Sequence, residues 1–190
     1  MNKALRRTTL AVVQIAVASA TVSAAKFALM AIPNVEAVSL LLAVYGFVLG
    51  WKGIAAALVF CASETLIWGA GTWVVTYFMY WPFLAGVFAL LGKTVKPSAI
   101  IATVVAFVMT LWFCVLSSLV DVGLTSGNFE NFGERFTIYF LRGTWFYVAQ
   151  IVCNLVLFPL LFKPLTSSLN RLINKTPPLT PPENGSGNGI

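Results

Sequence analysis

Histidine is absent from this 190-residue chain, and charged residues make up only 9% of it. Without histidine the chain has no Ser-His hydrolase triad, no histidine-ligated haem site and none of the usual membrane metalloprotease sites. The P-loop pattern G-x-x-x-x-G-K-S/T is also absent, which excludes that route to ATP binding. No nucleophile–base pair or metal-ligand cluster is recognisable. We therefore expect a protein that is not an enzyme and that needs no metal or other cofactor.

Neither the cysteines nor the net charge indicates a metal or nucleic-acid site. Cys61, Cys114 and Cys153 all lie inside apolar runs, without the paired spacing of a disulfide framework or a zinc motif. We interpret them as small core residues. The net charge is +6, but the basic residues are spread over short connections between apolar runs. A nucleic-acid site needs them clustered on one face, so we expect no nucleic-acid partner.

What the chain has in abundance is apolar sequence. It is 59% hydrophobic, with a mean hydropathy of +0.89, whereas a soluble domain carries roughly 25% charged residues. A bilayer accepts this composition, so the chain is predicted to be an all-α integral membrane protein. The apolar run 8–30 follows a basic N-terminus and is longer than the core of a signal peptide. We interpret it as a retained first helix.

The apolar runs predict a bundle of six transmembrane helices. They cover residues 8–30, 35–50, 53–68, 73–91, 98–120 and 141–162. The second and third runs are short against the roughly 20 residues that a span needs. The longest polar break, 121–139, is expected to be a functional loop. We assign residues 1–175 to the membrane domain and expect the Pro-, Gly- and Asn-rich tail 176–190 to be disordered in the cytoplasm.

Charge placement predicts that both termini are cytoplasmic. With the N-terminus inside, most basic residues fall on the cytoplasmic side: Lys3, Arg6, Arg7, Lys52, Lys93, Lys96, Lys163, Arg171 and Lys175. The outer side then holds Lys26, Arg135 and Arg142, together with every acidic residue except Glu183. This bias matches the positive-inside rule.

Small residues recur every fourth position in the first predicted helix, at Ala16, Ala20, Ala24 and Ala28. This spacing puts them on nearly one face, and such stripes let helix backbones approach closely in lipid. The alanine stripe either packs against another helix of the same chain or docks a separate membrane subunit. The spacing alone does not separate the two.

Three ionisable residues lie within or near the ends of predicted spans: Lys26, Glu36 and Glu64. Ionisable groups in a bilayer are costly and usually face a cavity, an ion pair or the interface. Lys26 can snorkel to the interface, but the carboxylate stem of Glu64 is too short to reach far. A pair between Lys26 and Glu64 is one open alternative.

Aromatic residues crowd the predicted outer side. They are Trp68, Trp73, Tyr77, Tyr80, Trp81, Phe129, Phe132, Phe136, Tyr139, Trp145 and Tyr147. An interfacial aromatic belt is one interpretation. The polar residues mixed among them favour a small-molecule pocket instead; these are Asn34, Glu36, Glu64, Asn128, Arg142, Gln150 and Asn154.

Two further segments have a recognisable pattern. Residues 32–38 read I-P-N-V-E-A-V, and residues 46–53 read G-F-V-L-G-W-K-G. Together with the alanine stripe, they resemble the substrate-binding S component of energy-coupling factor (ECF) transporters, which import vitamins and micronutrients into prokaryotes. The first is similar to an I-P-N-V-E-P-V signature, with Ala37 where the family often has proline. The chain departs from the family at residues 68–73, W-G-A-G-T-W, where relatives often carry an Asn/Pro/Gly-rich stretch.

The resemblance implies a six-helix bundle in the prokaryotic cell membrane, with both termini inside and a ligand pocket on the outer side. It implies that the alanine stripe docks a transmembrane coupling subunit. It also implies two ATP-binding cassette ATPases as further partners, which would hydrolyse the ATP that this chain cannot.

The leading hypothesis is therefore a subunit that captures a vitamin or related micronutrient on the outer face, such as cobalamin, a flavin, a nucleobase or a precursor. The polar contacts are expected from Asn34, Glu36, Glu64, Asn128 and Arg142, with Trp68, Trp73, Tyr77 and Trp145 stacking on the ligand. The alternative is a small structural or regulatory membrane protein that acts through helix–helix association, with the alanine stripe as its dimer face.

Overall fold

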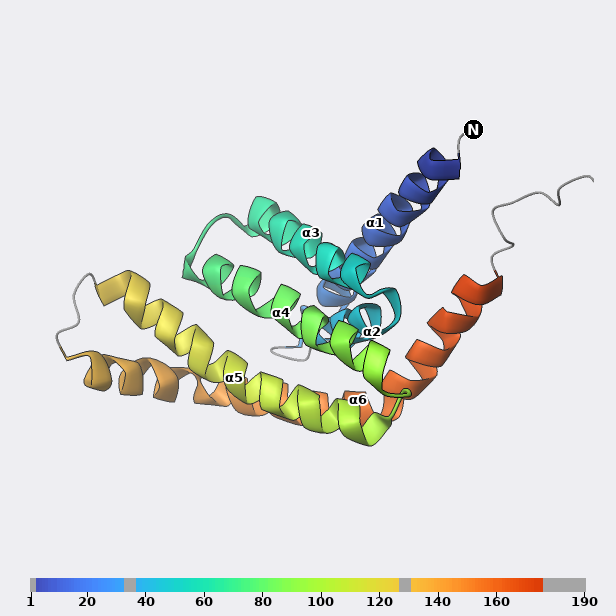
Figure 1. Cartoon of the computed structure of the whole chain (residues 1–190). Coiled ribbons are helices and arrows are strands. Elements are labelled where there is room, and N and C mark those ends of the chain that lie inside the picture. The colour runs from blue at the N-terminus through green and yellow to red at the C-terminus, as the bar shows by residue number, and fades with distance from the viewer. Residues whose placement is uncertain (1–2, 33–36, 127–130, 176–190) are drawn as a thin grey trace, which may run out of the picture.

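A computed structural model describes residues 3–32, 37–126 and 131–175, and its regular structure over these residues is entirely helical. The helices are α1 (Lys3–Leu29), α2 (Val38–Leu49), α3 (Trp51–Trp68), α4 (Thr72–Thr94), α5 (Ala99–Ser126) and α6 (Phe132–Lys175), as Figure 1 shows. Three of the predicted ligand contacts, Asn34, Glu36 and Asn128, lie outside the described residues, as does the predicted tail 176–190.

Five of the helices, α1, α3, α4, α5 and α6, are long and apolar enough to cross a membrane. The chain therefore has the all-helical, multi-span character that its composition predicts. The second predicted span differs, because α2 has only 12 residues and a straight span needs roughly 20. A short apolar helix of this kind is stable when longer neighbours surround it.

The prediction of a loop over residues 121–139 is wrong for most of its length. Helix α5 continues to Ser126 and α6 already begins at Phe132. Threonines in this stretch return hydrogen bonds to the backbone four residues earlier, from Thr125 Oγ1 to the Asp121 carbonyl at 2.6 Å and from Thr137 Oγ1 to the Gly133 carbonyl at 2.8 Å. Hydropathy reports the cost of entering lipid and does not report where a helix ends, so polar helix ends resembled a loop.

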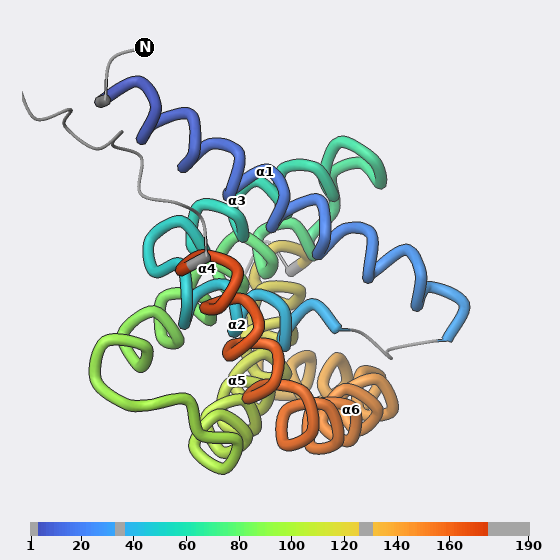
Figure 2. Tube along the Cα trace, turned by 90° about the vertical axis from the view of Figure 1, so that its right-hand side faces the viewer, coloured from blue at the N-terminus to red at the C-terminus, as the bar shows by residue number. Residues whose placement is uncertain are grey.

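Helix α2 lies at the centre of the bundle and contacts α3, α4 and α6 (Figure 1). Its side chains Val38, Leu40, Leu42 and Ala43 are almost completely buried. Helices α5 and α6 run side by side, and α4 packs on α5. Figure 2 shows that α1 runs across the other helices rather than along them. The short helix thus supplies the core around which the longer ones pack.

Glycines allow α2 to approach its neighbours closely. A Cβ on Gly46 would lie 2.2 Å from the Ala85 carbonyl oxygen of α4, and one on Gly92 would lie 2.1 Å from the Phe47 carbonyl oxygen of α2. Gly50 alone connects α2 to α3, with a φ of 61°, in the region that glycine adopts without steric cost. Residues of the 46–53 segment therefore have a packing role in the bundle.

Helix α6 is 44 residues long and contains Pro159 and Pro164, so the predicted span 141–162 is only its middle part. Each proline removes one backbone hydrogen bond and crowds the preceding turn, which bends a helix. Figure 1 shows the last part of α6 turning away from α5 toward the end of the molecule where α1 begins. One helix thus contacts both α5 and α2.

Candidate functional site

A salt bridge joins α1 to α3 inside the bundle. The Nζ of Lys26 donates a hydrogen bond to Oε2 of Glu64. The Glu64 side chain is completely buried and that of Lys26 is 25% exposed. The pairing that the sequence left open therefore forms. An ion pair is one of the arrangements in which ionisable side chains are found within a span.

Aromatic rings surround the Lys26–Glu64 pair. The Lys26 Nζ lies 5.1 Å from the centre of the Tyr77 ring and 5.9 Å from that of Phe60, distances at which a cation is attracted to the ring face. The Trp81 ring lies 5.7 Å from Tyr77 and the Trp73 ring 5.0 Å from it. We call Lys26, Phe60, Glu64, Trp73, Tyr77 and Trp81 the buried cluster.

Local helix geometry assembles this cluster. Phe60 and Glu64 are four residues apart on α3, and Tyr77 and Trp81 are four apart on α4, so each pair shares a helix face. The two faces meet because α3 packs against α4. At this contact Cys61 Sγ lies 3.4 Å from the Tyr77 carbonyl oxygen.

Several buried polar atoms have no hydrogen-bond partner among the described residues. Two belong to the buried cluster, Glu64 Oε1 and Trp81 Nε1. Further such atoms are Ser39 Oγ, Thr76 Oγ1 and Asn154 Oδ1. Buried polar groups are nearly always satisfied by protein, ligand or water, and leaving one unsatisfied costs about 1–3 kcal/mol. Glu64 Oε1 is thus a buried acceptor that a ligand or water donor would satisfy.

A buried amide side chain of α6, that of Asn154, is hydrogen-bonded to the neighbouring helix α5. Asn154 Nδ2 donates to Thr110 Oγ1 of α5 at 2.9 Å, and Thr110 donates in turn to the Ala106 carbonyl at 2.8 Å. Gln150 is also buried, at 6% exposure. Asn154 therefore contributes at least in part to packing between α5 and α6.

The polar ends of the helices are also tied together. Thr72, at the start of α4, donates from Oγ1 to Oδ1 of Asp121 on α5 at 2.5 Å. Ser118 Oγ lies 3.0 Å from the Tyr147 hydroxyl of α6. The acidic residue that the sequence placed in a loop is therefore a hydrogen-bond acceptor between two helices.

The structure brings only some of the predicted ligand contacts together. Glu64, Trp73 and Tyr77 belong to the buried cluster. Trp68 packs against Phe27 of α1 with ring centres 6.0 Å apart, and it remains 52% exposed. These four residues come from the end of α3 and the start of α4.

The two predicted contacts on α6 lie elsewhere. Arg142 is exposed, and Trp145 is 78% exposed. Trp145 lines a groove of about 470 Å³ with other α6 side chains, Val148, Ala149, Val152, Cys153, Val156 and Leu157. No residue of the buried cluster lines this groove. The helical pattern alone could not reveal that these residues are separate from Glu64, because it does not fix how α6 is rotated.

Phe60, Trp81 and Lys26 are cluster members that the predicted ligand contacts did not include. Helical spacing in the sequence could have indicated Phe60, because it precedes Glu64 by one helical turn on the same face. Trp81 was visible only as one of many aromatics. Its ring lies 6.5 Å from Phe60, a proximity that depends on α3–α4 packing.

All four residues of the alanine stripe are exposed. The buried side of α1 is formed instead by Ala18, Ser19 and Val22. Among the described residues, the stripe therefore does not pack against another helix of the same chain. This leaves the face of α1 with the smallest side chains open to lipid or to another protein.

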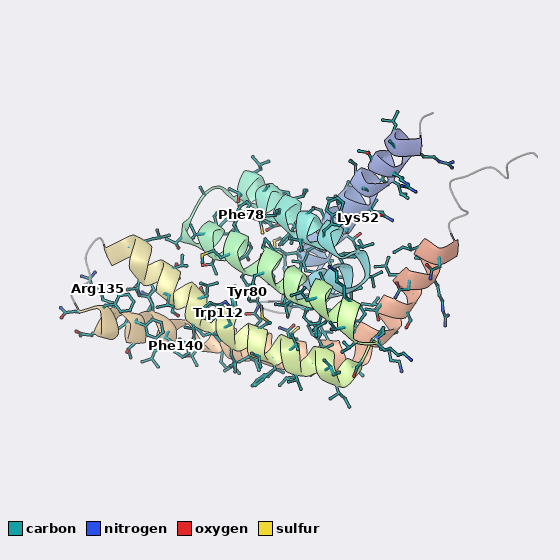
Figure 3. The ribbon with its side chains drawn as sticks, in the orientation of Figure 1. Lys52, Phe78, Tyr80, Trp112, Arg135 and Phe140 are labelled. Atoms are coloured by element: carbon teal, nitrogen blue, oxygen red, sulfur yellow. The ribbon has the colours of Figure 1, made fainter. Side chains whose placement is uncertain are left out.

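Figure 3 shows Lys52 and Arg135 at opposite ends of the bundle, as an antiparallel arrangement of spans requires. Over residues 3–32, 37–126 and 131–175, no three His, Cys, Asp or Glu side chains lie close enough to hold a metal ion.

Comparison with known proteins adds no relative, since no protein-family model, no curated protein and no solved structure matches this chain.

Proposed function

We propose that the chain is the substrate-specific S component of an ECF-type importer in the prokaryotic cell membrane, with both termini in the cytoplasm. It captures a vitamin or related micronutrient, such as cobalamin, a flavin or a precursor, at the outer face. A transmembrane coupling subunit and two ATP-binding cassette ATPases then provide the energy. The chain itself performs no covalent chemistry.

The observation that carries this proposal is the buried Glu64 carboxylate with one oxygen unpartnered among the described residues. A buried ion pair is a poor way to gain stability, because well-packed apolar side chains of similar volume often do as well or better. The pair is therefore more readily explained by a functional need for a polar group at this depth. Glu64 Oε1 accepts a hydrogen bond from the ligand, and Trp81 Nε1 donates one.

The aromatic members of the buried cluster supply the rest of a binding surface. Flat apolar walls with a few placed polar groups are typical of small-molecule sites. Trp73, Tyr77 and Trp81 form a continuous edge-to-face series on α4. Such rings favour a planar ligand, which fits a flavin or a nucleobase-like precursor.

The exposed alanine stripe supports the partner part of the proposal. Four small residues in one row let a second transmembrane helix approach the α1 backbone closely. Ala18 and Val22 occupy the packed side of α1. The alanine stripe therefore faces away from α3, the helix that carries Glu64. A coupling subunit docked there leaves the ligand site free.

The first test is to purify the chain in mild detergent and to identify any bound small molecule by mass spectrometry. A vitamin or related ring compound should be found, and adding it should change tryptophan fluorescence saturably. Glu64→Gln should weaken binding by about tenfold or more, as expected for loss of a charged hydrogen bond. Glu134→Gln, which alters an exposed acid in the first turn of α6, is the matched control and should bind normally.

The proposal fails if no ligand co-purifies, if a panel of vitamins and nucleobases gives no saturable signal, and if co-expression with an ECF energising module gives no uptake. Equal binding by Glu64→Gln and wild type would remove Glu64 from the site.

A second candidate function is a structural or regulatory protein that self-associates through α1. The exposure of all four stripe alanines favours it as well. It predicts a dimer in bilayers, measurable by energy transfer between labelled copies. Under this alternative, Ala20→Leu abolishes the dimer and no nutrient is bound by either form.

A further inference from the structure

A second site lies at the end of the bundle away from Arg135. The last part of α6, the first half of α1 and the end of α2 enclose a groove of about 310 Å³. Its walls are mostly apolar: Leu10, Val13, Val17 and Ala18 from α1, Tyr45 and Leu49 from α2, and Leu169, Leu172 and Ile173 from α6, with Gln14 as the one amide. The groove is not enclosed, since Val13, Val17 and Leu172 remain 50%, 60% and 66% exposed.

Positive charge gathers at one end of this groove. Lys52 Nζ, at the start of α3, donates to Gln14 Oε1 at 2.6 Å, which places its ammonium group at the groove wall. Arg7 is exposed and precedes Leu10 by three residues and Gln14 by seven, so it lies on the groove face of α1 about one turn before Leu10.

Nothing acidic balances these cations. The residues before Glu36, those between Glu36 and Glu64, and those between Glu134 and Glu183 include no Asp or Glu, and these stretches hold all three walls. The described partner of Lys52 is the neutral amide of Gln14. Among the described residues no carboxylate pairs with Lys52 or Arg7. The end of the groove is therefore complementary to an anion.

A ligand that fits has one anionic end and a long apolar body. Anionic phospholipids have this form, and basic pockets between transmembrane helices on the cytoplasmic side are known binding places for their headgroups. The groove is partly exposed and belongs to a chain whose helices are apolar enough to cross a membrane, so we expect a lipid to reach it without leaving the bilayer. A small soluble anion would leave the apolar walls of the groove without contacts.

We propose that this groove binds one anionic phospholipid of the surrounding leaflet, with its phosphate on Lys52 and Arg7 and an acyl chain along Leu10, Val17 and Leu172. The lipid fills the space between the bent end of α6 and α1. It thereby fixes the last part of α6 against the first half of α1. This site is separate from the buried cluster and does not depend on the proposed transport function.

The test uses the full chain in neutral phosphatidylcholine nanodiscs, with phosphatidylglycerol added as the probe. Native mass spectrometry of the released protein should retain one phosphatidylglycerol, and the thermal unfolding temperature should rise with the amount added, because a ligand of the folded state stabilises it. The variant with Arg7→Gln and Lys52→Gln should bind phosphatidylglycerol about tenfold more weakly or worse.

The control variant carries Lys96→Gln and Arg135→Gln, which remove the same charge from positions that do not line the groove, Lys96 being exposed and Arg135 half-buried. It should bind like wild type. Arg7→Gln alone, at an exposed position, serves if the double variant does not fold. Val17→Asn should weaken phosphatidylglycerol binding without changing any charge.

Three results overturn the proposal. One is equal retention of phosphatidylcholine and phosphatidylglycerol. Another is unchanged binding by the variant with Arg7→Gln and Lys52→Gln. The third is stabilisation by inorganic phosphate alone to the same extent as by phosphatidylglycerol, which would assign the site to a soluble anion.

Discussion

Lys26 of α1 and Glu64 of α3, separated by 38 residues in the chain, form a salt bridge in which the carboxylate is completely buried. The pair fixes α1, which runs across the other helices (Figure 2), to the hairpin of α3 and α4. The same carboxylate retains an oxygen without a described partner. One residue thus connects the packing of the bundle with its candidate ligand site.

Removal of one member of this pair should be costly. Glu64→Gln leaves the Lys26 ammonium without a counter-charge and should lower the free energy of unfolding by about 3–5 kcal/mol. Replacing both, with Lys26→Met and Glu64→Leu, should recover most of that stability while abolishing ligand binding. Denaturant titration in detergent, followed by tryptophan fluorescence, measures both effects. If the double variant loses as much stability as the two single variants together, the residues are not energetically coupled.

Substitution of the close-contact glycines should loosen the centre of the bundle. Gly46→Ala and Gly92→Ala place a methyl group 2.2 Å and 2.1 Å from carbonyl oxygens of a facing helix, and each should destabilise by about 1–3 kcal/mol through overpacking. Gly123→Ala is the control, because its Cβ meets nothing within 4 Å, and it should be neutral or stabilise by up to about 1 kcal/mol. Similar melting temperatures for all three variants would show that α2 and α4 are not so close.

The hydrogen bond between Asn154 and Thr110 should contribute measurably to α5–α6 packing. A double-mutant cycle of Asn154→Leu and Thr110→Val should give a coupling energy of about 0.6–1.7 kcal/mol. Within the described part of the chain, the hydroxyl of Thr103 bonds to its own helix at Ala99, so Thr103→Val combined with Asn154→Leu should be additive. An additive result for the Thr110 cycle would contradict the contact.

Bulky residues in the alanine stripe should separate capture from uptake. Ala20→Leu and Ala24→Leu alter exposed positions, so ligand binding should be retained, while uptake with the proposed coupling subunit and ATPases should fall at least about tenfold as the close helix approach is lost. Ala62→Leu changes an exposed alanine on α3 and should leave uptake intact. Normal uptake by the stripe variants would remove the stripe from the partner interface.

Much of the fold could be predicted from local pattern. The apolar runs located helices within a few residues, for example 53–68 against α3 at Trp51–Trp68, because the free energy of entering lipid is a sum over neighbouring residues. The same pattern missed the polar ends of α5 and α6 and shortened α6 to its apolar middle. Those ends are held by helix–helix contacts such as Thr125 Oγ1 with the Tyr139 hydroxyl at 3.3 Å.

The candidate site was less accessible to prediction. Glu64 was recognisable because a carboxylate within a span is costly wherever it points. Its neighbours Phe60 and Trp81 depended on how α3 and α4 are rotated against each other, which a single sequence does not specify. For the same reason Trp145, equally aromatic, lies on an exposed face of α6.

By itself, then, the sequence determined that this is a helical membrane protein, where its spans approximately lie and that it carries an alanine stripe. Each of these features depends on composition and spacing within one segment. The tertiary structure decided that Lys26 pairs with Glu64, that the stripe is exposed and that Lys52 is hydrogen-bonded to a residue lining an apolar groove. These features depend on the rotation and crossing of helices far apart in the chain. The energies that set them are sums over contacts between segments, which no single segment contains.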